Sequence, residues 1–464
     1  MLKKLLIVSF FIGLSSLINS SKAQTTTETI SLQKAMEIAL KNNFQIQQAE
    51  NNLEVSEANV FASKMNLFTP DLNGNLRFGQ TQGRQFNNVT GTIIDQITTS
   101  SSGGINASFT LFDGFRNINT LRNANSNKVS QQERLKRAKE DLIFNVASQY
   151  LAILLDNQLL SISKENLLSS NAQLNLIKAQ VEVGSRPVAD LYNQESIVSN
   201  NELTILQREN TLNNDKLRLI RILQIDPTKD YQFEIPQISS VSSIKQLDFN
   251  DLLSKAINNR SDLKAQVALI ESNRLNYKSS IGQHYPTISL SAGLNTNYND
   301  RFIEPIFDAN NTVIGTQKVA FGDQFFDRNR NLSFSLNIQI PIYNQFSVRN
   351  SVVRSKISYK NSVLDLDNQK LAVIQEVRQA YNDYLSFAKQ LEAAEKTLTF
   401  AKKSLETQQE RYNIGASTLI ELAQANAQFV EASSNRAQSQ FRLIFQEQLI
   451  NYYVGKINPD FTLN

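Results

Sequence analysis

Histidine, cysteine and clustered carboxylates are the side chains that most often perform catalysis or hold metal ions, and this chain contains few of them. Its 464 residues include one histidine, His284, and no cysteine. The sequence contains neither a glycine-rich phosphate loop nor a carboxylate pair in a recognisable pocket context. We therefore expect no enzymatic activity, no metal site and no cofactor. His284 is expected to pack beside Tyr285 at an interface.

Two acidic residues occupy matching places. Asp190 stands six residues after Gly184, and Glu421 stands six residues after Gly415. Each glycine predicts a helix reversal, because glycine adopts the left-handed backbone conformation that ends many helices. Each acid then lies in the first turns of the returning helix, where a carboxylate commonly stabilises the helix dipole.

The elements that would position these residues occur twice. When the chain is shifted by 231 positions, its first half aligns with its second half without a gap from the end of a strand-like segment through a long helical hairpin. Matching pairs include Ile105 with Leu336, Tyr150 with Tyr381, Leu160 with Leu391, and Gly184 with Gly415. A fixed offset over more than a hundred residues indicates a duplicated structural unit.

Composition argues against a set of ordinary globular domains. The hydrophobic fraction is 41% and the charged fraction 19%, with no tryptophan and few glycines and prolines. This balance is typical of long, narrow and partly wet surfaces rather than of large cores. The formal net charge of +4 gives no indication of nucleic-acid binding.

Residues 1–23 carry the pattern of a signal peptide. Lys3 and Lys4 precede an apolar run from Leu5 to Ile18, and Ser21-Lys22-Ala23 forms a cleavage site. A short membrane anchor is the alternative, although such a run is too short to span a bilayer. We expect the mature protein to begin at Gln24, outside the inner membrane. Because no later stretch reaches eighteen apolar residues, membrane attachment must come from the fold itself.

Four segments alternate apolar and polar residues with the period of a β-strand. They are residues 71–79, 104–112, 287–295 and 332–342. Such segments suit a transmembrane barrel, in which one face meets lipid and the other meets water. A soluble, half-buried sheet is the alternative. Because four strands cannot close a barrel, several chains must share one.

Most of the remaining sequence predicts helix with the narrow apolar stripe of coiled-coil packing. The predicted segments are 31–65, 115–183, 188–224, 248–281, 346–414 and 419–455. Hairpin tips are expected at 184–187 and 415–418, and an irregular equatorial stretch at 225–247. This pattern divides the mature chain into repeats at 24–247 and 248–464, each a rod of roughly 100 Å. An ordinary helical bundle is the alternative.

The order and spacing of several motifs resemble the TolC family of outer-membrane efflux channels, across essentially the whole mature chain. The motifs are ALKNN at 39–43, echoed by AINNR at 256–260; PDL at 70–72, echoed by PTI at 286–288; LFDG at 111–114; and the tips VEVGS at 181–185 and YNIGA at 412–416. The resemblance implies a mixed α/β homotrimer whose twelve strands form one barrel in outer-membrane lipid. A helical tunnel would continue that barrel across the periplasm.

The same resemblance implies a passive exit duct of a tripartite multidrug efflux or type I secretion system. Substrates would reach it from an inner-membrane pump through a periplasmic adaptor. The adaptor would contact the tip residues Val183, Gly184, Ser185, Arg186, Ile414, Gly415, Ala416 and Ser417. Because a duct is indifferent to its cargo, substrate specificity would lie in the pump. For each tip glycine taken alone, the alternative is that it only forms the turn and does not contact an adaptor.

Members of the TolC family narrow the periplasmic aperture with rings of acidic residues at about the level of Asp190 and Glu421. By resemblance, either acid could form a threefold gate ring. Gln424 stands where some members carry a second acid, which would weaken the ring. A rival function is a structural envelope scaffold without transport. A water-filled lumen lined by polar strand residues such as Arg77 would distinguish the duct from the scaffold.

Overall fold

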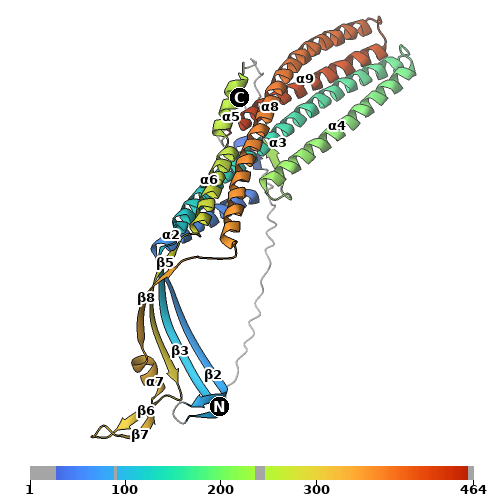
Figure 1. Cartoon of the computed structure of the whole chain (residues 1–464). Coiled ribbons are helices and arrows are strands. Elements are labelled where there is room, and N and C mark those ends of the chain that lie inside the picture. Colours follow the sequence, from blue (N-terminus) through green and yellow to red (C-terminus); the bar gives the residue numbers. More distant parts are fainter. Residues whose placement is uncertain (1–27, 88–90, 236–245, 458–464) are drawn as a thin grey trace, which may run out of the picture.

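The computed structural model describes residues 28–87, 91–235 and 246–457. The molecule is elongated, with a β-sheet at one end, two helical hairpins at the other and further helices between them (Figure 1). The predicted signal peptide at 1–23 lies outside the described residues, as do residues 236–245 of the predicted equatorial stretch. The sheet and the hairpins therefore stand far apart along one long axis.

Four long strands form one antiparallel sheet in the order β2-β3-β5-β8. They are β2 (Asp71–Asn87), β3 (Thr92–Phe112), β5 (Thr287–Asn299) and β8 (Asn331–Gln339). Their register gathers exposed apolar side chains on one side of the sheet, which we call the apolar face: Leu72, Leu76, Phe78, Ile105, Leu290, Leu294, Leu332, Phe334, Leu336 and Ile338. The opposite side, the polar face, carries Asn73, Asn75, Asn106, Ser108, Ser289, Ser291, Ser335 and Asn337. The sequence alternation thus becomes two chemically distinct surfaces.

The strand bounds differ from the prediction at several strand ends, and β5 ends at Asn299 rather than at residue 295. The hairpin of β2 and β3 continues past residue 79 and begins again before residue 104, and its backbone ladder runs from the Gly79–Ser100 pair to the Asn87–Thr92 pair. Strand β8 ends at Gln339 rather than at residue 342. Pro341 has no backbone N–H to donate to a ladder, which is the physical reason for the earlier end.

Two helical hairpins form the other end of the molecule. The first joins α3 (Arg116–Glu182) to α4 (Val188–Leu223), and the second joins α8 (Ser347–Asn413) to α9 (Leu419–Tyr453). Helices α3 and α8 have 67 residues each, which corresponds to roughly 100 Å at the helical rise. The predicted lengths and the two reversals are found within two residues of the expected positions.

The predicted helices at 31–65 and 248–281 are each broken once. The first consists of α1 (Leu32–Asn42) and α2 (Phe44–Phe68), and the second of α5 (Phe249–Asn259) and α6 (Ser261–Gly282). The Asn43 side chain accepts hydrogen bonds from the backbone N–H groups of Gln45 and Ile46, and so caps α2. The prediction of unbroken helices was wrong, and at the first break the reason is that it did not weigh this capping chemistry.

Arg260 occupies the second break and is only 4% exposed. Its guanidinium forms ion pairs with Asp262 at 2.7 Å and with Glu376 of α8 at 2.6 Å. A buried charge is stable only when it is paired and hydrogen-bonded. Arg260 therefore ties the α5–α6 junction to the long helix of the second hairpin.

A short two-stranded sheet packs against α3 near its middle, and we call this region the collar. There β1 (Glu28–Ile30) pairs in parallel with β4 (Tyr231–Phe233). The buried hydroxyl of Tyr150 on α3 donates towards the carbonyl oxygens of Ile30 and Glu234, at 3.1 and 2.7 Å. The largest apolar cluster lies here and joins α1, α3, α4 and α9. The collar thus contains the largest of the apolar clusters formed by the described residues.

The strands pass into the long helices through consecutive residues with left-handed backbone. Gly114 has φ 71° and Phe115 φ 66° before α3, while Gln345 has φ 53° and Phe346 φ 59° before α8. A Cβ added at Gly114 would overlap the carbonyl oxygen of Gly282, and a Cβ at Gly282 would lie 2.6 Å from the carbonyl oxygen of Gly114. Two backbones therefore meet at the base of the sheet with no room for a side chain.

The segment between β5 and β8 is more ordered than a simple loop. It contains a hairpin of β6 (Ile303–Phe307) and β7 (Val313–Lys318), then the short helix α7 (Phe321–Asp323) and the π-helical turn η1 (Gln324–Arg328). These elements lie at the end of the sheet remote from the helices (Figure 1).

Candidate functional site

Both hairpin tips are built around a glycine in the left-handed conformation. Gly184 has φ 73° and Gly415 has φ 75°. At the first tip the N–H of Ser185 donates to the carbonyl oxygen of Gln180 at 2.9 Å, and at the second Ala416 donates to Arg411 at 2.8 Å. This bond pattern satisfies the last carbonyl groups of a helix. Nothing lies within 4 Å of a Cβ added at either glycine, so the tips have open space around them.

An exposed apolar side chain precedes each tip glycine. Val183 is 78% exposed and Ile414 is 80% exposed. Each belongs to the set predicted from the sequence to contact an adaptor. Both tips lie at the same end of the molecule (Figure 1), so the fold presents two apolar contact points there.

The second tip holds Glu421 in a capping box. The Glu421 carboxylate accepts hydrogen bonds from the N–H of Thr418 at 2.9 Å and from the hydroxyl of Ser417 at 2.7 Å, while its own N–H donates to the Thr418 hydroxyl. The backbone bond from Thr418, followed by the Ser417 hydroxyl, lowers the pKa of this carboxyl below its usual range. Glu421 is therefore charged and stabilises the start of α9.

The first tip uses a different arrangement. The Arg186 guanidinium lies 3.5 Å from the Asp190 carboxylate. It also lies 4.3 Å from the ring centroid of Tyr412, which belongs to α8 of the other hairpin. Tyr412 is only 1% exposed and packs in a small apolar cluster with Ile177 and Leu422. Arg186 thus links the tip of one hairpin to the buried aromatic ring of the other.

The structure does not join the two predicted gate acids. Asp190 pairs with Arg186, and Glu421 pairs with the start of its own helix. Among the described residues, no ion pair or hydrogen bond connects Asp190 with Glu421. Gln424 is exposed one turn further along α9. The two acids therefore occupy separate local environments within one chain.

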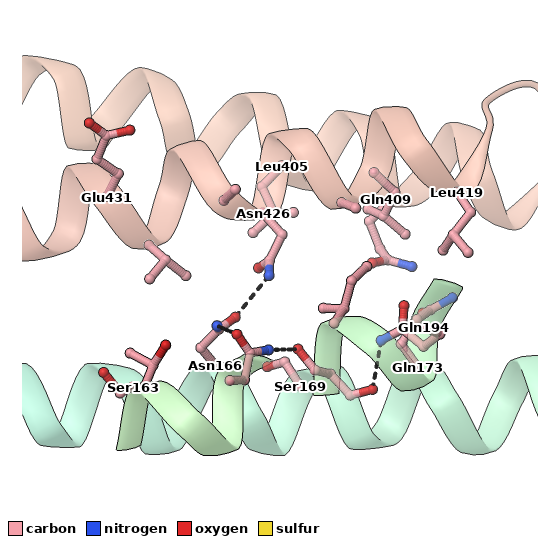
Figure 2. A pocket seen from close by; sticks show the side chains of 18 of the residues that line it. Ser163, Asn166, Ser169, Gln173, Gln194, Leu405, Gln409, Leu419, Asn426 and Glu431 are labelled. Atoms are coloured by element: carbon pink, nitrogen blue, oxygen red, sulfur yellow. Dashed lines mark hydrogen bonds between the residues drawn. The ribbon is translucent and has the colours of Figure 1, made fainter. Parts of the chain in front are cut away.

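A cavity of about 620 Å³, lined by both polar and apolar side chains, lies behind the tips, between the two hairpins. Figure 2 shows a chain of amide and hydroxyl groups across it. Asn426 of α9 donates to Asn166 of α3 at 2.8 Å, and Asn166 donates to Asn201 of α4 at 3.1 Å. Asn201 then donates to the hydroxyl of Ser170 at 2.7 Å. Because water can replace such bonds at small net cost, the hairpins are held together here by contacts that can be exchanged.

The comparisons with known proteins decide the family. Residues 35–223 and 252–451 match the family described as outer membrane efflux protein. This chain belongs to that family. The predicted resemblance is confirmed, and the protein is an outer-membrane protein that spans into the periplasm. The family is one of channels rather than of enzymes. The first matched segment contains α3 and α4, and the second contains α8 and all but the last two residues of α9.

Relatives match nearly end to end. Outer membrane protein TolC of Salmonella enteritidis is 21% identical, covering 89% of this chain and 83% of its own length. Toxin and drug export protein A of Aggregatibacter actinomycetemcomitans is 25% identical, covering 86% and 80%. The CmeC outer membrane channel of Campylobacter jejuni superposes with a TM-score of 0.77 at 16% identity, covering 93% of this chain and 87% of CmeC. That structural likeness shows a shared fold.

The lone histidine and the acidic side chains are further candidates for parts of a catalytic or metal site. His284 is exposed and lies in the turn between α6 and β5, next to exposed Tyr285. Within residues 28–87, 91–235 and 246–457, no group of three or more histidine, cysteine, aspartate or glutamate side chains could hold a metal ion. In the same part of the chain, none of the helices is long and apolar enough to cross a membrane.

Sequence reasoning missed the roles of Arg186 and Tyr412 as partners. Tyr412 stands in the second tip motif at the place where the first tip has Val181. An aromatic residue replacing an aliphatic one at matching positions was the available signal. Its partner could not be identified, because the contact joins two hairpins far apart in the sequence.

Asp156 and Asp215 form a carboxyl pair in the first hairpin that should make the free energy of unfolding depend on pH. Burial, helped by a hydrogen bond with Asp215, raises the pKa of Asp156 to about 6 from its usual 3.8. The folded protein thus holds a proton that the unfolded chain releases, so this stabilisation is present below pH 4 and is lost as the pH rises through 6. We expect Asp156→Asn to raise the unfolding free energy at pH 8 by about 1 kcal/mol after solvent screening.

Guanidinium unfolding at pH 8 and pH 3.5 would measure this difference. The gain should be absent at pH 3.5, where the carboxyl is protonated in both states. Asp367→Asn, at an exposed position of α8, is the matched control and should change neither midpoint. An equal effect of Asp156→Asn at both pH values would contradict the raised pKa of Asp156 in the folded protein.

Proposed function

We propose that three copies of this chain form the outer-membrane exit duct of a tripartite efflux or type I secretion system. The observation that carries the proposal is the two-faced sheet, with its apolar and polar faces, joined to helical hairpins of about 100 Å. A sheet with one apolar face and one polar face suits a barrel between lipid and water. The family agrees with this role, and so do the matches, over most of each chain, to an outer membrane protein TolC and to a toxin and drug export protein.

Closure of the barrel requires more than one chain. Strands β2 and β8 lie at the two edges of the sheet, and within the described residues each pairs with one neighbour only. Unpaired backbone groups are costly in lipid. Three copies supply twelve strands if β8 of one copy pairs with β2 of the next. The equal lengths of α3 and α8, which begin 231 positions apart, support a duplicated unit and a tunnel of repeated rods.

The tips are the proposed entrance and docking site. A periplasmic adaptor would contact the exposed Val183 and Ile414 beside the open glycine turns. The link from Arg186 to Tyr412 and the exchangeable amide chain behind it would hold the hairpins together in the closed state. Opening would then separate the hairpins while water solvates the amides. An inner-membrane pump would supply the substrate.

Asp190, Glu421 and Gln424 remain the proposed gate residues. We expect Glu421→Ala to raise single-channel conductance, because it removes a charge from the proposed threefold aperture and also the capping box of α9. Glu421→Gln keeps hydrogen-bonding capacity at lower charge and separates the two causes. Planar-bilayer recording would measure both variants, and an unchanged conductance for each would remove Glu421 from the gate.

Conductance also separates the duct from the alternative of a structural scaffold. Purified trimers in a planar bilayer should carry ionic current, because Asn75, Asn106 and Ser291 on the polar face would line a wet lumen. A scaffold without transport would insert and remain electrically silent. Replacing Ser291 with lysine should shift the ion selectivity of the current towards anions if the polar face lines the pore.

A further inference from the structure

The segment 319–330, comprising α7, η1 and their flanking residues, lies against the apolar face of the sheet. A Cβ added at Gly103 of β3 would lie 2.9 Å from the Phe325 ring and 2.8 Å from the Leu76 side chain. Gly103 and Leu76 are register partners, so their side-chain positions share one face. The Phe325 ring therefore packs on the same face that presents Leu72 and Phe78.

Hydrogen bonds anchor the segment in this position. Gln324 is 1% exposed, and its amide donates to the carbonyl oxygens of Asn299 and Val319 at 3.1 and 2.8 Å. The same side chain accepts from the N–H of Asn299 at 3.1 Å. The hydroxyl of Thr296 donates to the carbonyl oxygen of Phe325 at 2.6 Å. A buried amide that makes three hydrogen bonds thus holds the segment on β5.

Several aromatic rings of segment 319–330 cluster together, and two of them are exposed. The Phe321 ring meets the Tyr298 ring edge to face, with ring centroids 5.0 Å apart, and stacks on the Phe325 ring, with centroids 5.1 Å apart. The Phe326 ring meets the Phe325 ring edge to face at 5.3 Å. Phe326 is nevertheless 67% exposed and Phe321 is 41% exposed. Two ion pairs involve the charged residues of the segment. Arg328 pairs with Glu304 of the β6–β7 hairpin, and Asp327 lies 3.4 Å from Arg330 within the segment. The segment thus combines exposed aromatic rings with paired charges, and it lies against the apolar face.

We propose that segment 319–330 is a membrane anchor whose Phe321 and Phe326 rings insert among the acyl chains of outer-leaflet lipid. The inference rests on the proposed placement of the sheet in the membrane. The occupant is lipid because the exposed rings are continuous with the apolar face, which no described part of the chain covers elsewhere. Amphipathic segments with phenylalanine on one side bind at the boundary between headgroups and acyl chains. The anchor fixes the height of the barrel in the bilayer.

The chain contains no tryptophan, so one substitution creates a clean fluorescent probe. Phe326→Trp trimers would be reconstituted in phosphatidylcholine vesicles whose acyl chains are brominated either near the headgroup or near the chain end. We expect about a twofold loss of emission with bromine near the headgroup and a smaller loss with bromine near the chain end. Soluble iodide should quench this emission weakly.

Two control variants make the result decisive. Phe334→Trp, on the apolar face of β8, should be quenched by brominated chains, and Phe307→Trp, on the β6–β7 hairpin, should be quenched by iodide instead. Iodide quenching of the Phe326→Trp variant without bromine quenching would overturn the anchor. Emission shielded from both quenchers would also overturn it, because a neighbouring copy would then cover the ring. Failure of bromine quenching at Phe334→Trp would overturn the membrane placement of the sheet itself.

Discussion

Arg186→Ala is expected to raise the conductance of the reconstituted trimer and the fraction of time that it stays open. The guanidinium joins Asp190 at 3.5 Å and the buried Tyr412 ring at 4.3 Å, so it connects the two hairpins at the proposed entrance. A partly desolvated cation–π contact contributes about 1–2 kcal/mol. Its loss should shift the ratio of open to closed states by about tenfold.

Single-channel recording in planar bilayers would measure this shift. Lys164→Ala is the matched control. Lys164 forms an ion pair with Glu209 of the same hairpin, with 3.0 Å between Nζ and Oε1. Removal of that ion pair leaves the contact between hairpins intact and should leave conductance unchanged. An Arg186→Ala trace indistinguishable from that of the unmodified protein would show that the Arg186–Tyr412 contact does not hold the entrance closed.

Gly114→Ala is expected to prevent stable trimers from accumulating in the outer membrane. An alanine there adopts left-handed backbone at a cost of about 1–2 kcal/mol, and its Cβ overlaps the carbonyl oxygen of Gly282. The carbonyl oxygen is part of the backbone, and the Cβ of the alanine is bonded directly to the backbone. No side-chain rotation can therefore relieve the overlap. The junction between β3 and α3 must shift, and the sheet and tunnel lose their alignment.

Gly184→Ala separates backbone strain from the overlap. Gly184 has φ 73° against 71° for Gly114, but nothing lies within 4 Å of its added Cβ. We therefore expect Gly184→Ala to yield trimers at nearly normal levels and Gly114→Ala to yield almost none. Heat-modifiable electrophoresis of outer membranes would measure both. Equal trimer levels for the two variants would contradict the role of close backbone approach.

The long-range architecture was predictable from the sequence where side-chain periodicity carries it. Alternation located all four strands of the sheet, and uninterrupted helical spacing located both long helices and their glycine turns. The extension of β2 and β3 beyond residues 79 and 104 was not predicted, because its apolar residues, among them Phe86, Ile93 and Ile97, are too widely spaced among polar residues to give a continuous alternation. The helix break at Asn43 was visible only as capping chemistry.

Contacts between distant segments were beyond the reach of periodicity. The position of Arg186 over Tyr412 depends on how two hairpins align, and the sequence specifies each hairpin separately. The seating of Phe325 on Gly103 likewise joins an Asn/Asp-rich segment to a strand more than two hundred positions earlier. The sequence identified the tip residues as a group, whereas only the fold distinguishes the capping role of Glu421 from the linking role of Arg186.

In-cell photocrosslinking from the tips tests the exit-duct account most directly. A benzophenone amino acid would replace Val183 or Ile414, the two most exposed apolar tip residues, with Phe334 on the sheet as the control position. With the pumps expressed, both tip positions should capture a periplasmic adaptor of an export pump, identified by mass spectrometry, and the control should not. Capture of only neighbouring copies of the same chain from both tips would contradict the duct and favour the structural scaffold.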